Sequence, residues 1–393
     1  MPMIRQLLGM RDEPPNNLQR RVTLQSLLAN YLSSHGYQTI DTPILQPTEL
    51  FLRKSGGELA NRMYSFTDAG GNKISLRPEF TASVIRHYLE NADDYEIPLK
   101  VQYNGPVFRY DNDRLYRQFH QVGAEVIGSA DSNSDGEILG LAFGCASELG
   151  LLNTEVVLGH VGVLHLIFEN MGLSQKSQNF LISNLPRIKK NKAEIETLNN
   201  EASNLGLIKN PCNNDSAKLI ENMDDVEALK LLKNLFRDSL SGLVGSRSTE
   251  EILGRFVYKL RRGDTQESIE NGLELCADLV ETRGPEETAL ANITAIIKKY
   301  GVDPNVLEPL ERVLITFHSL DKNPNLIVDL SLVRGIAYYT GMVFEIIAND
   351  NTVPTLICGG GRYDGLIKAL GGKDDTPALG FAYDMDSIIG LLS

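Results

Sequence analysis

The fold is decided by two stretches, Leu332-Val-Arg-Gly-Ile-Ala-Tyr-Tyr-Thr-Gly-Met-Val-Phe-Glu345 and Cys358-Gly-Gly-Gly-Arg-Tyr-Asp-Gly365. β-Branched and aromatic residues flank the polar turn Asn349-Asp350-Asn351, which predicts a β-hairpin. Arg334, Tyr338 and Tyr339 fall on its first arm. An arginine and two tyrosines beside a glycine run suit a small ligand that carries a carboxylate. An ordinary sheet with core tyrosines and a glycine bulge explains the pattern equally well.

The composition is that of an ordinary globular protein. The chain has 393 residues, of which 42% are hydrophobic and 23% charged, and this length predicts two domains. The amino terminus lacks a hydrophobic signal core and no apolar run is long enough for a membrane span, so we predict a cytoplasmic protein without a membrane partner. The net charge of −13 argues against general nucleic-acid binding.

The four cysteines lie far apart and form no CxxC pair. This spacing predicts reduced thiols and no metal site, and no cofactor is predicted either. The cysteines are Cys145, Cys212, Cys276 and Cys358.

The first part of the chain alternates helices with short strands. Apolar residues at spacings of three and four predict a helix over 18–35, and an extended segment with two prolines follows at 37–47. Asn104-Gly105 is predicted to join two strands, 99–103 and 106–110. From 165 to 325 the periodicity is helical almost throughout. We therefore predict a first domain part over 1–164, a mainly helical insertion over 165–325 and a second domain part over 326–393.

The segment 116–127 alternates as a strand with polar residues on one face. Gln121 and Glu125 lie on that face, and Val122 and Ala124 lie on the other. Burying either polar side chain without a partner costs several kcal/mol, so the pattern predicts a ligand or polar partners. A solvent-facing sheet surface is the alternative. Glu79 lies near a predicted helix start, where its negative charge would interact favourably with the helix dipole. This is the structural interpretation of Glu79.

Five motifs in this order resemble the catalytic domain of histidyl-tRNA synthetases. The resemblance covers roughly 1 to 160 and 325 to 392. It implies an α+β fold of the class II aminoacyl-tRNA synthetase type, with an antiparallel sheet flanked by helices and a dimer formed around Pro43. The motifs are Leu76-Arg-Pro-Glu-Phe-Thr81, Phe108-Arg109, Tyr116-Arg-Gln-Phe-His-Gln-Val-Gly-Ala-Glu125, Leu332-Val-Arg-Gly-Ile-Ala-Tyr-Tyr-Thr-Gly341 and Gly360-Gly-Arg-Tyr-Asp-Gly365.

The resemblance also implies a histidine pocket. Its expected amino-group ligands are Glu79, Thr81, Gln121 and Glu125. The residues expected near the imidazole and the carboxylate are Arg334, Tyr338 and Tyr339. Arg109 corresponds to the arginine that contacts carboxylate and phosphate in the family.

Several positions depart from the family pattern. Ser387 stands where the family has an arginine that grips the γ-phosphate of ATP, and a hydroxyl cannot replace a guanidinium in that task. The loop 111–115 is short, with Asp111 in place of glutamate and Leu115 in place of an arginine. Ala337 replaces an aspartate. The chain ends after the last motif, so no anticodon-binding domain is expected.

These departures resemble a paralogous family, the regulatory subunits of ATP phosphoribosyltransferase. That resemblance implies a chain with no catalytic residues and no enzymatic activity of its own. Its partners would be a short-form catalytic subunit, a second copy of itself within a hetero-oligomer, and L-histidine as the feedback inhibitor of histidine biosynthesis, with no tRNA. The alternative is a histidine-activating enzyme, either a split histidyl-tRNA synthetase or a related acyl transferase, because Arg109 and Arg117 are kept. A synthetase-like module that binds RNA or protein is a third interpretation.

Overall fold

The structure, a computed structural model, describes residues 3–53, 59–111, 115–131, 133–209, 230–233, 263–320, 324–334, 338–349 and 353–392. Contacts divide the chain into two compact units. The first is Met1–Leu164, Thr282–Ala295 and Pro304–Ser393, and the second is His165–Glu281 and Ile296–Asp303. The domain boundaries that we predict from the sequence stay a prediction. Ala337, Cys212, the middle of the loop 111–115 and most of the turn at 349–351 lie outside the described residues.

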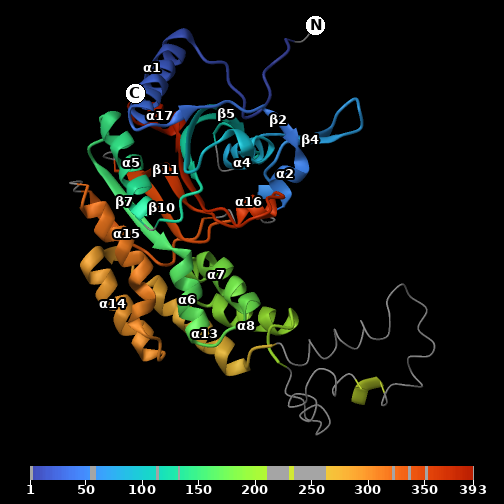
Figure 1. The fold of residues 1–393 in the computed structure, drawn as a ribbon, viewed down its shortest axis with the longest axis vertical. Helices are drawn as coiled ribbons and strands as arrows, with labels where there is room; N and C mark the ends of the chain where they lie inside the picture. The colour runs from blue at the N-terminus through green and yellow to red at the C-terminus, as the bar shows by residue number, and fades with distance from the viewer. Residues whose placement is uncertain are drawn as a thin grey trace. The chain divides into compact units, whose positions relative to one another are not determined.

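The first unit is built on a nine-stranded sheet with the order β1-β5-β6-β12-β11-β10-β7-β9-β8 (Figure 1). Its centre is antiparallel from β5 to β7, whereas β1 pairs with β5 and β7 pairs with β9 in parallel. The strands are β1 (Gln38–Thr39), β5 (Leu99–Phe108), β6 (Gln118–Ile127), β7 (Thr154–His160), β8 (Gly284–Pro285), β9 (Asn325–Val328), β10 (Met342–Ala348), β11 (Thr355–Arg362) and β12 (Ala378–Asp384). A small sheet has the order β2-β4-β3, from β2 (Leu45–Pro47), β3 (Ser65–Thr67) and β4 (Lys73–Leu76).

Helices flank the large sheet. On one side, α1 (Pro15–Ser34) contacts β5 and β6, and α5 (Asn133–Glu148) contacts β10, β11 and β12. The remaining helices with residues in this unit are α2 (Thr48–Leu52), α4 (Thr81–Glu90), α6 (Val161–Asn170), α14 (Glu286–Lys299), α15 (Glu308–His318), α16 (Leu366–Ala369) and α17 (Met385–Leu391). Among the described residues, no helix is long and apolar enough to span a membrane.

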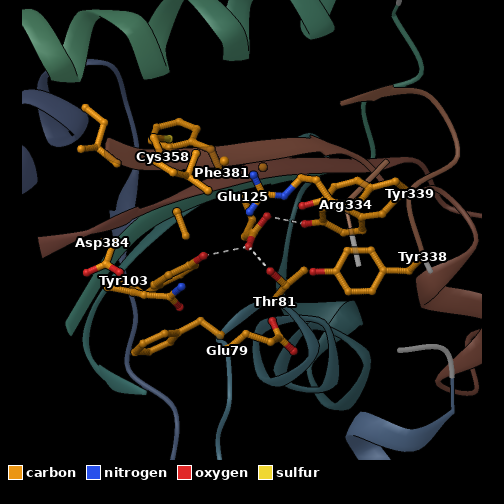
Figure 2. Close-up of a pocket in the computed structure, with 18 of the residues that line it drawn as sticks. Glu79, Thr81, Tyr103, Glu125, Arg334, Tyr338, Tyr339, Cys358, Phe381 and Asp384 are labelled. Carbon is orange, nitrogen blue, oxygen red and sulfur yellow. Dashed lines mark hydrogen bonds between the residues drawn. The ribbon is translucent and has the colours of Figure 1, made fainter. Parts of the chain in front are cut away.

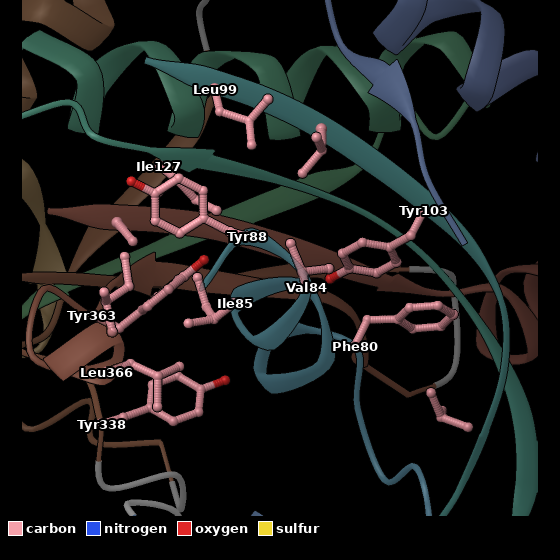
Figure 3. Close-up of a cluster of buried hydrophobic side chains, with 14 of the residues drawn as sticks. Phe80, Val84, Ile85, Tyr88, Leu99, Tyr103, Ile127, Tyr338, Tyr363 and Leu366 are labelled. Carbon is pink, nitrogen blue, oxygen red and sulfur yellow. The ribbon is translucent and has the colours of Figure 1, made fainter. Parts of the chain in front are cut away.

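The other side of the sheet holds α4 and the core beneath it (Figure 3). Val84, Ile85 and Tyr88 recur at helical spacing, so they share one face of α4 and are buried together. They pack with Val101 and Tyr103, which point to this side because alternate residues of a strand share a face. Tyrosines from the two carboxyl-terminal motifs join the same cluster, which brings those motifs to α4. They are Tyr338 and Tyr363.

The second unit is mainly helical where it is described, with one β-bridge between Ile208 and Asp264. Its described residues include α7 (Gln175–Lys190), α8 (Glu194–Asn204) and α13 (Gln266–Val280), and α13 contacts both of the others. The hydroxyls of Ser174 and Thr265 accept backbone hydrogen bonds at the starts of α7 and α13, which satisfies amide groups that have no partner within the helix.

The predicted turn at Asn104-Gly105 is wrong. β5 runs through both residues and pairs with β6 along its whole length, with Gly105 opposite Gln121. Glycine is required here because the side chain of Arg77 approaches the backbone closely, and not because the chain turns. A Cβ on Gly105 would crowd the guanidinium of Arg77. Arg77 is buried and donates to the carbonyl oxygen of Pro106 at 2.9 Å, so the space beside Gly105 is occupied.

The predicted hairpin forms, but its first arm is shorter than expected. β10 pairs with β11 from Val343 opposite Gly361 to Ala348 opposite Thr355. Arg334, Tyr338 and Tyr339 precede this strand and lie in a non-strand segment. The sequence alone does not show that the strand begins only at Met342.

Candidate functional site

One cavity in the first unit brings together all eight residues predicted to bind histidine (Figure 2). Its volume is about 110 Å³. The residues come from the start of α4, the end of β5, β6 and the segment before β10. They are Glu79, Thr81, Arg109, Gln121, Glu125, Arg334, Tyr338 and Tyr339. Their assignment to histidine stays a prediction.

Glu125 of β6 lies at the centre of this cavity with 1% of its surface exposed. Its Oε1 accepts hydrogen bonds from the hydroxyls of Thr81 at 2.8 Å and Tyr103 at 3.1 Å. Its Oε2 accepts a hydrogen bond from the hydroxyl of Tyr363. Three hydroxyl donors from three separate segments therefore hold the carboxyl group in one orientation, as Figure 2 shows for Thr81 and Tyr103.

Burial raises the pKa of Glu125 to about 8. The hydroxyl donors of Tyr363 and Thr81 lower this pKa, and the neighbouring charge of Glu79 raises it, but desolvation is the largest effect. Burial also raises the pKa of Glu79. The hydrogen bond from the amide of Ala82 and the positive charge of Arg109 lower this pKa, but desolvation is the largest effect. The amide nitrogen of Ala82 donates to Oε1 of Glu79 at 3.1 Å, so this carboxyl group both lines the cavity and satisfies an amide in the first turn of α4.

The raised pKa of Glu125 predicts a pH-dependent stability. The folded state holds its proton up to about pH 8, whereas the unfolded chain loses it near the ordinary value of 4.5. The protonated Glu125 therefore contributes its full stabilisation of the folded state below pH 4.5. This contribution to the free energy of unfolding, about 5 kcal/mol in total, is lost as the pH rises through 8. In chemical denaturation of the ligand-free protein, we expect Glu125→Gln to remove most of this loss between pH 5 and pH 9.

The matched control for this measurement is Glu311→Gln, because Glu311 is an exposed residue of α15 in the same unit. It should leave the pH dependence of the wild type in place. A Glu125→Gln profile parallel to the wild-type profile would contradict the assignment of the titration to Glu125.

The cavity also contains cationic side chains. Nη1 of Arg334 donates to Oε1 of Glu345 at 3.1 Å, and Nε of Arg109 donates to the carbonyl oxygen of Pro78 at 2.9 Å. Two buried polar atoms, Oε1 of Gln121 and Nε of Arg334, have no hydrogen-bond partner in the described part of the chain. An acceptor and a donor left unpaired in one cavity are what a polar ligand would satisfy.

Two glycines provide the room for these charged groups. A Cβ on Gly359 would overlap the guanidinium of Arg334, and a Cβ on Gly380 would overlap the carboxylate of Glu125. Gly359 on β11 and Gly380 on β12 are thus required by close approach. At Gly359 the group that approaches the glycine run is an arginine of the chain itself.

Sequence reasoning missed two tyrosines that contact Glu125. Tyr103 faces the cavity because it lies two residues after the buried Val101 on β5 and so shares its face, and this period was available in the sequence. Tyr363 belongs to a motif that we quote above, but nothing local shows where its hydroxyl points. Its neighbour Arg362 points elsewhere: its Nε donates to Oδ1 of Asp135 in α5 at 2.9 Å, so it joins β11 to that helix.

The arrangement suits a small zwitterion. Carboxylates of Glu79 and Glu125 accept from a cation, and guanidinium groups of Arg109 and Arg334 donate to an anion. The ring centroids of Tyr338 and Tyr339 lie 5.0 Å apart, and the two rings add an apolar wall to the same cavity.

Comparisons with known proteins agree with the motifs. A family model described as histidyl-tRNA synthetase matches residues 9–240 and 234–388. A histidine–tRNA ligase of Methanococcus vannielii is 30% identical over 383 residues, which cover 97% of this chain and 74% of that protein. A histidine–tRNA ligase of Metallosphaera sedula is 30% identical over 385 residues, which cover 95% of this chain and 73% of that protein.

Solved structures share the fold. One from Bacillus halodurans, described as an ATP phosphoribosyltransferase regulatory subunit/histidyl-tRNA synthetase, has a TM-score of 0.69 at 23% identity and covers 100% of this chain and 84% of that chain. The apo histidyl-tRNA synthetase of S. aureus has a TM-score of 0.56 at 22% identity, with 99% and 70% covered. These likenesses confirm the predicted class II synthetase fold.

The relatives contradict one prediction. We expected no enzymatic activity from this chain, because Ser387 and Leu115 replace arginines of the family pattern. Four relatives at 28% to 30% identity, each of which matches 97% of the chain, are nevertheless named as ligases. A few substituted positions therefore weigh less than similarity over the whole length. The expectation that tRNA is not a partner loses its support for the same reason.

Proposed function

Because the chain belongs to the histidyl-tRNA synthetase family, we propose that it is an enzyme that activates histidine with ATP and transfers the histidyl group to tRNA. The support comes from relatives named histidine–tRNA ligase and from the polar cavity around Glu125. The observation that carries the proposal is the unpaired acceptor and donor, Gln121 and Arg334, in a cavity that also holds buried carboxyl groups.

In this proposal the first step is adenylation. An oxygen of the histidine carboxylate forms a bond to the α-phosphorus of ATP, and the bond from that phosphorus to the bridging oxygen breaks. Pyrophosphate leaves with the electron pair, so the step needs no oxidant or reductant. Arg109 and Arg334 stabilise the negative charge, while Glu79 and Glu125 hold the cationic part of histidine. The ribose hydroxyl of tRNA then attacks the carbonyl carbon and releases AMP.

Because Ser387 stands where the family has an arginine, binding of the ATP phosphates is the part of this proposal that most needs other residues. Ser387 lies in the first turn of α17, where its amide donates to Oδ1 of Asp384 at 3.2 Å, and it offers no positive charge. If the chain is an adenylating enzyme, its phosphate contacts depend on other cations. Arg109 is one, with its guanidinium 5.2 Å from the ring centroid of Phe119, another residue of the cavity.

The experiment that tests this proposal is histidine-dependent exchange between ATP and pyrophosphate. We expect the wild type to catalyse histidine-dependent exchange. The exchange rate should fall by about two orders of magnitude or more in Arg109→Ala, because this variant loses a charged contact worth about 3 kcal/mol. The control is Arg312→Ala, because Arg312 lies on α15, where it forms an ion pair with Glu308 of the same helix. No exchange above background at high protein concentration, with histidine binding intact, would exclude adenylation.

A second candidate function uses the same cavity for regulation. The Bacillus halodurans neighbour is described in part as an ATP phosphoribosyltransferase regulatory subunit, and Ser387 favours a site that binds histidine more readily than ATP. In this candidate the partner is a short-form ATP phosphoribosyltransferase, and histidine lowers the activity of the complex. Co-purification of the two chains, with turnover measured with and without histidine, tests it.

Two further features belong to the proposal. A cytoplasmic location follows from the expected substrates. Self-association around Pro43 is consistent with the exposed side chains next to it, since Ile44 is 40% and Leu45 is 49% exposed.

A further inference from the structure

We propose that the first unit has a second small-molecule site, on the face of the large sheet opposite the Glu125 cavity, that takes a free aromatic amino acid. The site is a cavity of about 420 Å³. It lies between the end of α1, the start of α5 and the paired residues Lys100 of β5 and Val126 of β6. It goes beyond the proposed function, because that function requires no ligand at this place.

The walls of this cavity are aromatic and aliphatic. Tyr31 and His35 of the α1 end lie with their ring centroids 4.4 Å apart, and Tyr37 follows them. Ile138 and Leu141 of α5 provide the aliphatic wall. A concave site with apolar walls and few polar groups is the usual form of a small-molecule site.

The two charged residues of this cavity have no ion pair. Neither Lys100 nor Glu137 forms a salt bridge with any residue that the structure describes. Nζ of Lys100 lies 5.8 Å from the ring centroid of Tyr37. Glu137 lines the same cavity as this ring, and its charge adds to burial in raising the pKa of the Tyr37 hydroxyl. Opposite charges therefore flank one aromatic wall, and they match the carboxylate and the ammonium of a zwitterion.

The two cavities are separated by the sheet itself. Glu125 and Val126 are consecutive on β6, so their side chains point to opposite faces, and the same holds for Lys100 and Val101 on β5. A ligand beside Lys100 therefore cannot overlap one beside Glu125. We expect both to bind at the same time.

The test is calorimetry of the full chain with L-phenylalanine and L-tryptophan, in the presence of saturating L-histidine. We expect binding of one equivalent of at least one of them. Lys100→Met and Glu137→Gln should each raise Kd about tenfold, because each removes one charged contact. Phenethylamine lacks the carboxylate, so in Lys100→Met its Kd should equal that of L-phenylalanine. Phenylacetate lacks the ammonium, so in Glu137→Gln its Kd should equal that of L-phenylalanine.

The matched controls are Lys73→Met and Glu311→Gln, which change exposed residues away from the cavity and should leave Kd unchanged. Thermal unfolding of each variant verifies that it is folded, and Glu137 is itself exposed, so its variant should fold. The inference is overturned if neither amino acid binds at millimolar concentration, if L-histidine displaces the bound one, or if both charge variants bind as the wild type does. None of these outcomes depends on ATP or on tRNA, so a failure of the proposed function would leave this test unaffected.

Discussion

We expect Glu125→Gln to lower kcat/KM for histidine by about two orders of magnitude in the exchange assay. The amide keeps the shape of the side chain but carries no charge, and its amino group turns a donor toward the hydroxyls of Tyr103, Thr81 or Tyr363. Losing a charged acceptor in a buried site costs about 3 kcal/mol, and each 1.4 kcal/mol is a factor of ten. The substitution also removes the ionisation of this carboxyl group.

The pH dependence of this loss identifies its cause. At pH 6 most of the Glu125 carboxyl group is protonated, because burial raises its pKa to about 8, and it must give up that proton to pair with a cation. The gap between wild type and variant should therefore widen from pH 6 to pH 8. Glu311→Gln is the control. A gap that stays constant would mean that Glu125 acts through shape and not through charge.

We expect Gly359→Ala to abolish most of the activity while the protein stays folded. The new Cβ overlaps Nη1, Nη2 and Cζ of Arg334, which are all atoms at the end of one flexible side chain. The arginine must therefore leave its place beside Glu345, whereas the backbone of β11 can remain. We expect a loss of about a hundredfold in histidine-dependent exchange, equal to that of Arg334→Ala, since both remove the same charged contact.

Two controls separate this effect from a general cost of adding a methyl group. Gly390→Ala places its Cβ on α17 with no atom within 4 Å, so it should be silent. The double variant Gly359→Ala with Arg334→Ala should be no worse than Arg334→Ala alone, because the two changes act through one side chain. Additive losses would show that Gly359 serves the fold and not the arginine.

The sequence by itself determined the parts of this protein that depend on local periodicity. Alternation along 116–127 placed Gln121 and Glu125 on one face of a strand, and the structure keeps them on the cavity side of β6. Spacings of three and four indicated the first helix, which begins at Pro15 and ends at Ser34. The resemblance to the synthetase family added the eight pocket residues, which the cavity brings together.

Only the tertiary structure decided which distant groups meet. Tyr363 reaches Glu125 across 238 positions of the chain, and Arg362 reaches Asp135 across 227. These contacts depend on β12 lying between β6 and β11, and no local pattern specifies which strands become neighbours. The same limit explains the turn wrongly predicted at Gly105. A glycine is equally suited to a turn and to a crowded strand, and only the position of Arg77 distinguishes the two.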